Sequence, residues 1–125
     1  MERWNGIGGN ELSRLFTNPR FPRKPNQARK LPRLESPANK GNNYGLRLRT
    51  YFVPRRTGSY VFYVSGDDQC RLSISTDHTR RNLRMIVMFP KGLATGRRQW
   101  TKHKSQRSPR IRLYRGRVYY MEALM

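Results

Sequence analysis

The alternation of apolar and polar side chains from residue 44 onward constrains the fold of this chain more than any other feature. In YGLRLRTYF, residues 44–52, an apolar row alternates with Arg47 and Arg49. Successive side chains of a strand point to opposite faces, so this period of two predicts a strand with one apolar face and one arginine face. The same period returns in SYVFYVS, CRLSIS, IRLY and RVYYMEAL, while the apolar run RMIVMF predicts a strand covered on both faces.

Turn signals separate these short segments at intervals of about ten residues, which is typical of all-β domains. Pro54 to Gly58, Gly66 to Gln69 and Arg115-Gly116 contain the residues that turns favour. No helical period is sustained anywhere in the chain. The sequence therefore predicts an all-β fold, an antiparallel β-sandwich or barrel.

The first third of the chain has a different character. Five prolines in residues 17–43 exclude a helix or a central strand there, although Asn10 can cap one helical turn just before them. Two alternatives remain for this segment, a disordered basic linker or a long loop wrapped around the sheet. Wrapping is favoured by apolar residues at Phe16, Phe21, Leu31 and Leu34. We expect one domain over 1–125, with a Pro/Arg-rich wrap at 1–43 and core strands at 44–125.

The chain has a formal net charge of +20, from 27 basic and 7 acidic residues, and this charge favours anionic binding partners. Such a surface attracts nucleic acid, sulfated glycans or anionic membranes, and guanidinium groups favour bidentate contacts with their anions. The outward faces of the predicted strands at 44–52 and 111–114 form a candidate anion-binding face. Its residues are Arg47, Arg49, Arg110 and Arg112. The alternative is a solvated sheet face without a ligand.

Several classes of protein lose support from what the sequence lacks. No apolar run reaches the ~18 residues of a membrane span. The single cysteine, Cys70, has no disulfide partner, and its place in an apolar row predicts a buried, inert thiol. No phosphate-binding glycine loop is present, and His78 and His103 lack metal-ligand spacing.

The adjacent acids Asp67 and Asp68 lie in a predicted loop between strands. Neighbouring side chains of an extended chain point to opposite sides, whereas the carboxylates of glycosidases face each other across ~5–9.5 Å. We therefore expect that the chain is not an enzyme. Two interpretations of the pair stay open. One is a turn in which the Asp side chains bond their own backbone. The other is a calcium site, since calcium takes about 6–8 oxygen ligands.

Three blocks of the sequence follow one another in a specific order. The opening block is WNGIGGNELSRLFTNPRFP. The central block, NNYGLRLRTYFVPRRTGSYVFYVSGDDQCRLSISTD, has an aromatic strand, a turn, a Tyr-x-Phe strand and an Asp-Asp pair in this order. The closing block is RQWTKHKSQRSPRIRLYRGRVYYMEALM. Together these blocks resemble the PA14 domain family, and most closely the PA14 domains of fibrocystin-like cell-surface proteins.

The resemblance implies an extracellular β-sandwich or barrel that recognises carbohydrate. In the yeast adhesins of this family, the Asp-Asp pair forms a cis peptide that holds calcium, and the calcium binds sugar hydroxyls. Asp67 and Asp68 align with that pair. The family usually continues beyond the last residues of this chain, so we expect the sheet to lack its last strand or strands relative to the family.

The predicted function is therefore a carbohydrate-binding or adhesion module at the cell surface or outside the cell, assisted by calcium. The basic charge biases it toward sulfated or sialylated glycans. One alternative is a structural module of a larger extracellular protein that has no ligand of its own. A second is a non-specific binder of polyanions or nucleic acid, whose affinity falls steeply with salt.

Overall fold

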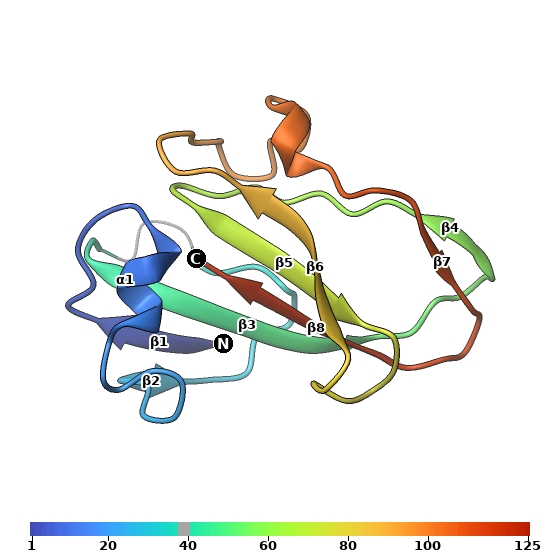
Figure 1. Cartoon of the computed structure of the whole chain (residues 1–125), viewed down its shortest axis with the longest axis horizontal. Helices are drawn as coiled ribbons and strands as arrows, with labels where there is room; N and C mark the ends of the chain where they lie inside the picture. The colour runs from blue at the N-terminus through green and yellow to red at the C-terminus, as the bar shows by residue number, and fades with distance from the viewer. Residues whose placement is uncertain (38–40) are drawn as a thin grey trace.

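Two antiparallel sheets lie against each other in the computed structural model, which describes residues 1–37 and 41–125 (Figure 1). The elements, in chain order, are β1 (Glu2–Asn5), α1 (Leu12–Phe16), β2 (Gln27–Ala28), β3 (Tyr44–Phe52), β4 (Gly58–Tyr60), β5 (Cys70–Ser75), β6 (Leu83–Phe89), the 3-10 helix η1 (Lys104–Gln106), β7 (Ile111–Leu113) and β8 (Tyr119–Leu124). The main sheet has six strands in the order β2-β1-β3-β8-β5-β6, and β4 pairs with β7 in the small sheet.

One face of the main sheet forms the larger hydrophobic core. Leu72 and Ile74 of β5 and Met121 of β8 pack there with Leu113 of β7. Because these apolar residues alternate with polar ones, their side chains all point to one face of the main sheet, and the small sheet packs against that face. The all-β prediction is confirmed, and no closed barrel is found among residues 1–37 and 41–125.

The opposite face of the main sheet is covered in part by α1 and the chain that follows it. Trp4, Leu12 and Leu15 form a second buried cluster, with Phe21 packed against it. The indole Nε1 of Trp4 donates a hydrogen bond to the Arg20 carbonyl at 3.2 Å. These contacts agree with the wrapping alternative around Phe21, while Gln27–Ala28 form the edge strand β2 and Leu34 is 39% exposed. Residues 38–40 lie outside the described residues.

Four local expectations were wrong. The strand at residues 84–89 is not covered on both faces, because Met85 and Met88 of β6 are 57% and 39% exposed. Residues 2–5 do not belong to the wrap, because they form β1 and pair with β3. The residue that precedes α1 is Glu11, not Asn10, and its side chain makes no capping hydrogen bond. The segment SYVFYVS is a strand only at its start, because the backbone N–H of Phe62 donates to the Ser108 hydroxyl instead of a backbone carbonyl.

The helices within the described part of the chain are short. None of them is both long and apolar enough to cross a bilayer.

Candidate functional site

The loop that carries Asp67 and Asp68 is fixed from two sides. The backbone N–H of Gly66 donates to the Thr95 hydroxyl at 2.9 Å, and the Thr95 N–H donates to the Gly66 carbonyl at 2.9 Å. On the other side, the Leu12 N–H at the start of α1 donates to the Gln69 side-chain oxygen at 2.8 Å. The two acids are thus held between α1 and the loop that follows β6.

Gly66 and Cys70 set how closely this loop approaches the core. A Cβ atom at Gly66 would lie 2.8 Å from the Cys70 sulfur, a contact that only glycine avoids. Cys70 is buried, as predicted, and burial raises the pKa of its thiol to about 12. The thiol therefore acts as a packing group beneath the acidic loop.

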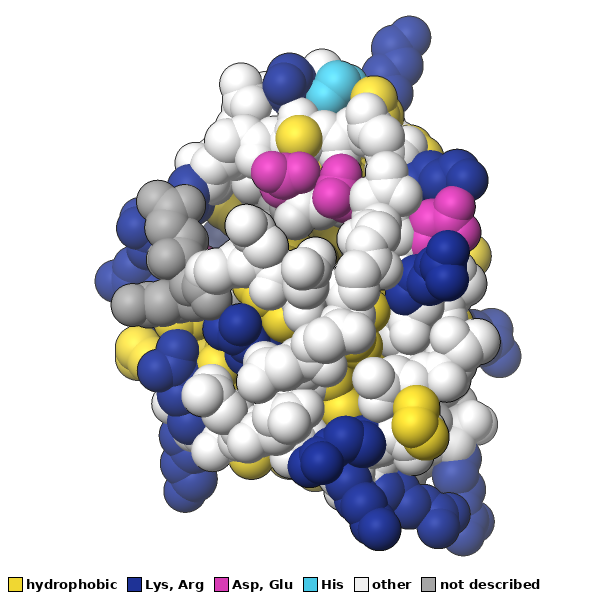
Figure 2. Space-filling view, turned by 90° about the vertical axis from the view of Figure 1, so that its left-hand side faces the viewer, with side chains coloured by type: hydrophobic (Ala, Val, Ile, Leu, Met, Phe, Trp, Pro, Cys, Tyr) yellow, Lys and Arg dark blue, Asp and Glu magenta, His cyan; other side chains and the backbone are white. Residues whose placement is uncertain are grey.

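The carboxylates of Asp67 and Asp68 differ in exposure, but both lack a hydrogen-bond or ion-pair partner among the described residues. Asp67 is exposed and Asp68 is half-buried, and the peptide bond between them is cis, the form that the resemblance implies. Burial, and then the charge of Asp67, raise the pKa of Asp68. No hydrogen bond or ion pair within residues 1–37 and 41–125 involves either carboxylate. Figure 2 shows this end of the molecule, where acidic side chains stand close together.

Asp77, in the loop after β5, shows what a turn carboxylate looks like when it bonds its neighbours. Its Oδ1 accepts hydrogen bonds from the Thr79 N–H and the Thr79 hydroxyl, both at 2.7 Å, and Asn82 donates to its Oδ2 at 2.7 Å. These hydrogen bonds lower the pKa of Asp77 to about 2. Asp67 and Asp68 make no such bonds, so the self-bonded turn that we considered for them is not observed in the described chain.

The Asp67–Asp68 pair fits a divalent cation in part. Two adjacent, unpaired carboxylates supply the hard oxygen ligands that calcium prefers. Within the described residues no third His, Cys, Asp or Glu side chain joins them to complete a cluster of three. The remaining ligands of an ion would therefore come from backbone carbonyls, water or the hydroxyls of a bound sugar.

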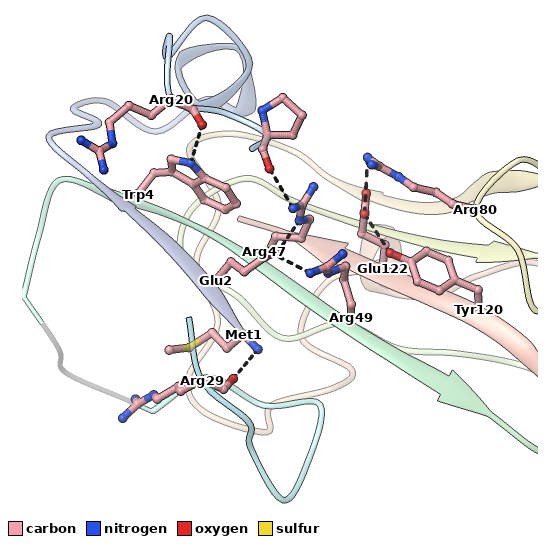
Figure 3. A network of polar contacts seen from close by, with 11 residues as sticks. Met1, Glu2, Trp4, Arg20, Arg29, Arg47, Arg49, Arg80, Tyr120 and Glu122 are labelled. Atoms are coloured by element: carbon pink, nitrogen blue, oxygen red, sulfur yellow. Dashed lines mark hydrogen bonds and ion pairs between the residues drawn. The ribbon is translucent and has the colours of Figure 1, made fainter. Parts of the chain in front are cut away.

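The predicted arginine face is wrong for Arg47. Its side chain is only 4% exposed, and its Nε lies 2.6 Å from Glu2 Oε2 (Figure 3). Its guanidinium also donates to the Pro22 carbonyl at 2.9 Å and lies over the Trp4 ring, 5.3 Å from the centroid. The reason is the N-terminal wrap, which covers a sheet face that the alternation alone assigned to solvent. Arg47 is a structural residue.

The other three predicted arginines do not share one face with each other. Arg49 is exposed on β3 and is ion-paired with Glu2 at 2.7 Å. Arg110 and Arg112 are exposed at the small sheet, in a different part of the molecule. The candidate anion-binding face of four arginines is therefore not assembled as expected.

A buried polar group that was not predicted from the sequence lies on the same face of the main sheet as Arg47. The Glu122 side chain is 1% exposed, accepts a hydrogen bond from the Tyr120 hydroxyl at 3.3 Å, and lies 3.6 Å from the Arg80 guanidinium (Figure 3). Its signal was present in RVYYMEAL, where Glu122 occupies the same alternating row as Tyr120 and Leu124. A charged residue within a row of large apolar groups indicates a buried carboxylate with partners.

Comparison with known proteins gives one relationship of note. No family model and no solved structure matches the chain. The chain is similar to the mouse protein N-acetyl-beta-glucosaminyl-glycoprotein 4-beta-N-acetylgalactosaminyltransferase 1 (Mus musculus), with 31% identity over 125 residues. The match covers 98% of this chain and 12% of the mouse protein.

This similarity contradicts the expectation that the chain is not an enzyme, because the relative is a glycosyltransferase. That expectation rested on missing hydrolase, phosphate-loop and metal patterns. Those patterns do not describe every part of a transferase, so their absence was a weak basis for exclusion. The chain spans about an eighth of its relative's length, since the match covers 12% of that protein.

Proposed function

We propose that this chain is the carbohydrate-recognising part of a glycosyltransferase, and that the loop of Asp67 and Asp68 is its sugar-binding site. The observation that carries the proposal is a pair of adjacent carboxylates that have no partner among residues 1–37 and 41–125, on a loop fixed from both sides. Two neighbouring negative charges repel each other, and burial, followed by the charge of Asp67, already raises the pKa of Asp68. A cation would remove this cost.

Calcium is the cation that the PA14 resemblance supports. When bound, it would supply a Lewis-acidic centre that takes sugar hydroxyls as ligands. Asp67, which is exposed, and Asp68, which is half-buried, would hold it. The chain's own contribution is rigid placement, because Gly66 and Gln69 tie the loop to Thr95 and to the start of α1.

The relative's name suggests the sugar. Its acceptor is an N-acetyl-beta-glucosaminyl-glycoprotein, and similarity to it extends over 98% of our chain. We therefore propose that the chain binds glycoprotein glycans that end in N-acetylglucosamine and presents them for transfer. A location at the cell surface or along the path of glycoproteins outside the cytosol fits this role and the PA14 resemblance.

A glycan panel tests this proposal. The panel holds glycans ending in N-acetylglucosamine, galactose or sialic acid, each tested in calcium and in chelator. We expect selective binding to the N-acetylglucosamine series that is lost in chelator and in the D67N/D68N variant. Binding of no glycan, with the fold intact, would instead support a structural module and overturn the proposal.

A second candidate function is glycosyl transfer by the chain itself, which the similarity to a transferase favours. The test is transfer of N-acetylgalactosamine from an activated donor to a glycoprotein ending in N-acetylglucosamine. Product formed by the isolated chain would support this candidate. Product formed only by a longer protein that includes the chain would assign the chain to acceptor recognition.

A further inference from the structure

A second charged surface lies at the end of the long axis opposite the Asp67–Asp68 loop. In Figure 1, β4 and β7 occupy one end, and α1 and the start of β5 occupy the other. The turn before β4 and the turn after β7 are bonded side by side. The Gly116 N–H donates to the Pro54 carbonyl at 3.0 Å, and the Arg115 N–H donates to the Thr57 hydroxyl at 2.9 Å.

These two turns and the outer face of β7 gather six arginines, all exposed. We name this set the arginine patch, and it consists of Arg55, Arg56, Arg110, Arg112, Arg115 and Arg117. The alternation on β7 explains part of the grouping, since Leu113 is buried while Arg112 points outward opposite Ser59. Arg110 and Arg112 are two residues apart on an extended chain, so their side chains emerge ~7 Å apart.

In the part of the chain that the structure describes, no carboxylate neutralises the arginine patch. None of the six guanidinium groups has an ion pair within residues 1–37 and 41–125. The acids of the chain lie elsewhere. Four acids are ion-paired with other bases, namely Glu2, Glu11, Glu35 and Glu122. Asp77 accepts hydrogen bonds within the loop after β5, and Asp67 and Asp68 lie at the opposite end of the molecule. Such a concentration of like charge is stabilised when an anion binds across it.

We propose that the arginine patch binds a sulfated glycan chain. Guanidinium groups take sulfate oxygens in bidentate hydrogen bonds, and a row of them suits an extended polymer with repeated sulfates. Proteins that bind single-stranded nucleic acid add base stacking to charge attraction, and stacking needs open aromatic faces. The Arg117 guanidinium covers one face of the exposed Tyr114 ring, 4.5 Å from its centroid, which reduces this patch as a stacking platform. The inference does not depend on the site at Asp67 and Asp68.

The test compares binding of a heparin-derived oligosaccharide by two variants of equal net charge. One variant is R110Q/R112Q/R115Q/R117Q. Its control removes four exposed bases from the N-terminal wrap, as R23Q/R29Q/K30Q/R33Q. We expect the patch variant to bind at least about tenfold more weakly with a shallower salt dependence, because fewer counterions are released. The control is expected to stay within about twofold of the unmodified chain, since its bases lie outside the patch.

Three further arms make the result decisive. R55Q/R56Q, in the other turn, should weaken heparin binding in the same direction, and it keeps the test valid if the fourfold variant fails to fold. Desulfated heparin should bind poorly, and D67N/D68N should bind heparin normally. Equal losses in the patch variant and the control would overturn the proposal in favour of overall charge. Single-stranded DNA that binds as tightly as heparin and depends equally on the patch would overturn the glycan assignment.

Discussion

Glu2 and Arg47 form an ion pair that joins β1 to β3, with Glu2 Oε2 2.6 Å from Arg47 Nε. The Arg47 side chain is 4% exposed and that of Glu2 is 13% exposed, so water screens the pair little. Burial alone would raise the pKa of Glu2, but the Arg47 hydrogen bond and the charges of Arg47 and Arg49 outweigh it and lower this pKa.

The first prediction is that Glu2→Gln lowers the free energy of unfolding by about 3 kcal/mol, because it leaves the buried Arg47 charge without its partner. Urea unfolding at pH 7 measures this change. The matched control is Glu35→Gln, whose partners Arg97 and Arg98 are largely exposed, and we expect it to change the free energy of unfolding much less than Glu2→Gln does. Equal effects of the two substitutions would show that burial of the Glu2–Arg47 pair does not matter.

The second prediction concerns acid stability and Asp77. The pKa of Asp77 is lowered from 3.8 to about 2 by its hydrogen bonds, so the unfolded chain binds its proton more readily than the folded chain does. The stability that Asp77 contributes is therefore present above pH 3.8 and is lost as the pH falls toward about 2. We expect Asp77→Asn to have a shallower loss of stability over this interval in unfolding measurements from pH 5 to pH 2. Identical slopes for both proteins would contradict the hydrogen bonds assigned to Asp77.

The third prediction concerns the contact beneath the acidic loop. Gly66→Ala places a methyl group 2.8 Å from the Cys70 sulfur, and this overpacking should destabilise the fold by about 1–3 kcal/mol. Gly58→Ala is the matched control, because nothing lies within 4 Å of a Cβ atom there. Adding Cys70→Ala to Gly66→Ala should recover part of the loss in a double-mutant cycle. Strictly additive effects of the two substitutions would show that the two residues are not in contact.

The fourth prediction concerns the Cys70 thiol itself. It is buried and its pKa is raised to about 12, so little thiolate forms at neutral pH. We expect a soluble disulfide reagent to label the folded protein more than about 100-fold more slowly than the protein unfolded in guanidinium chloride. Labelling of the folded protein at the rate of a free thiol would contradict the burial of Cys70.

Strong local patterns in the sequence determined where some strands lie. Residues 44–52 and 70–75 were predicted as strands and form β3 and β5 with those bounds, because their period of two is unbroken and turns flank both. β1 was missed. ERWN is too short to show a period, and its pairing with β3 is a contact between distant parts of the sequence.

For the candidate sites too, features of the local sequence were predictable and contacts between distant segments were not. The Asp67–Asp68 pair was identified because adjacent acids are conspicuous in so basic a chain. The alternation also predicted that Arg47 and Arg49 share a face, but it carries no information on what covers that face. The wrap that buries Arg47, and the neighbouring turns that assemble the arginine patch, are arrangements of distant segments.

Titration of a glycan ending in N-acetylglucosamine into the unmodified chain and into D67N/D68N tests whether the Asp67–Asp68 loop binds sugar. Each titration is made with calcium and with chelator, and circular dichroism first verifies that both proteins are folded. We predict binding only for the unmodified chain in calcium. Equal binding by both proteins, or binding that chelator leaves unchanged, would contradict the claim that Asp67 and Asp68 hold a calcium-dependent sugar site.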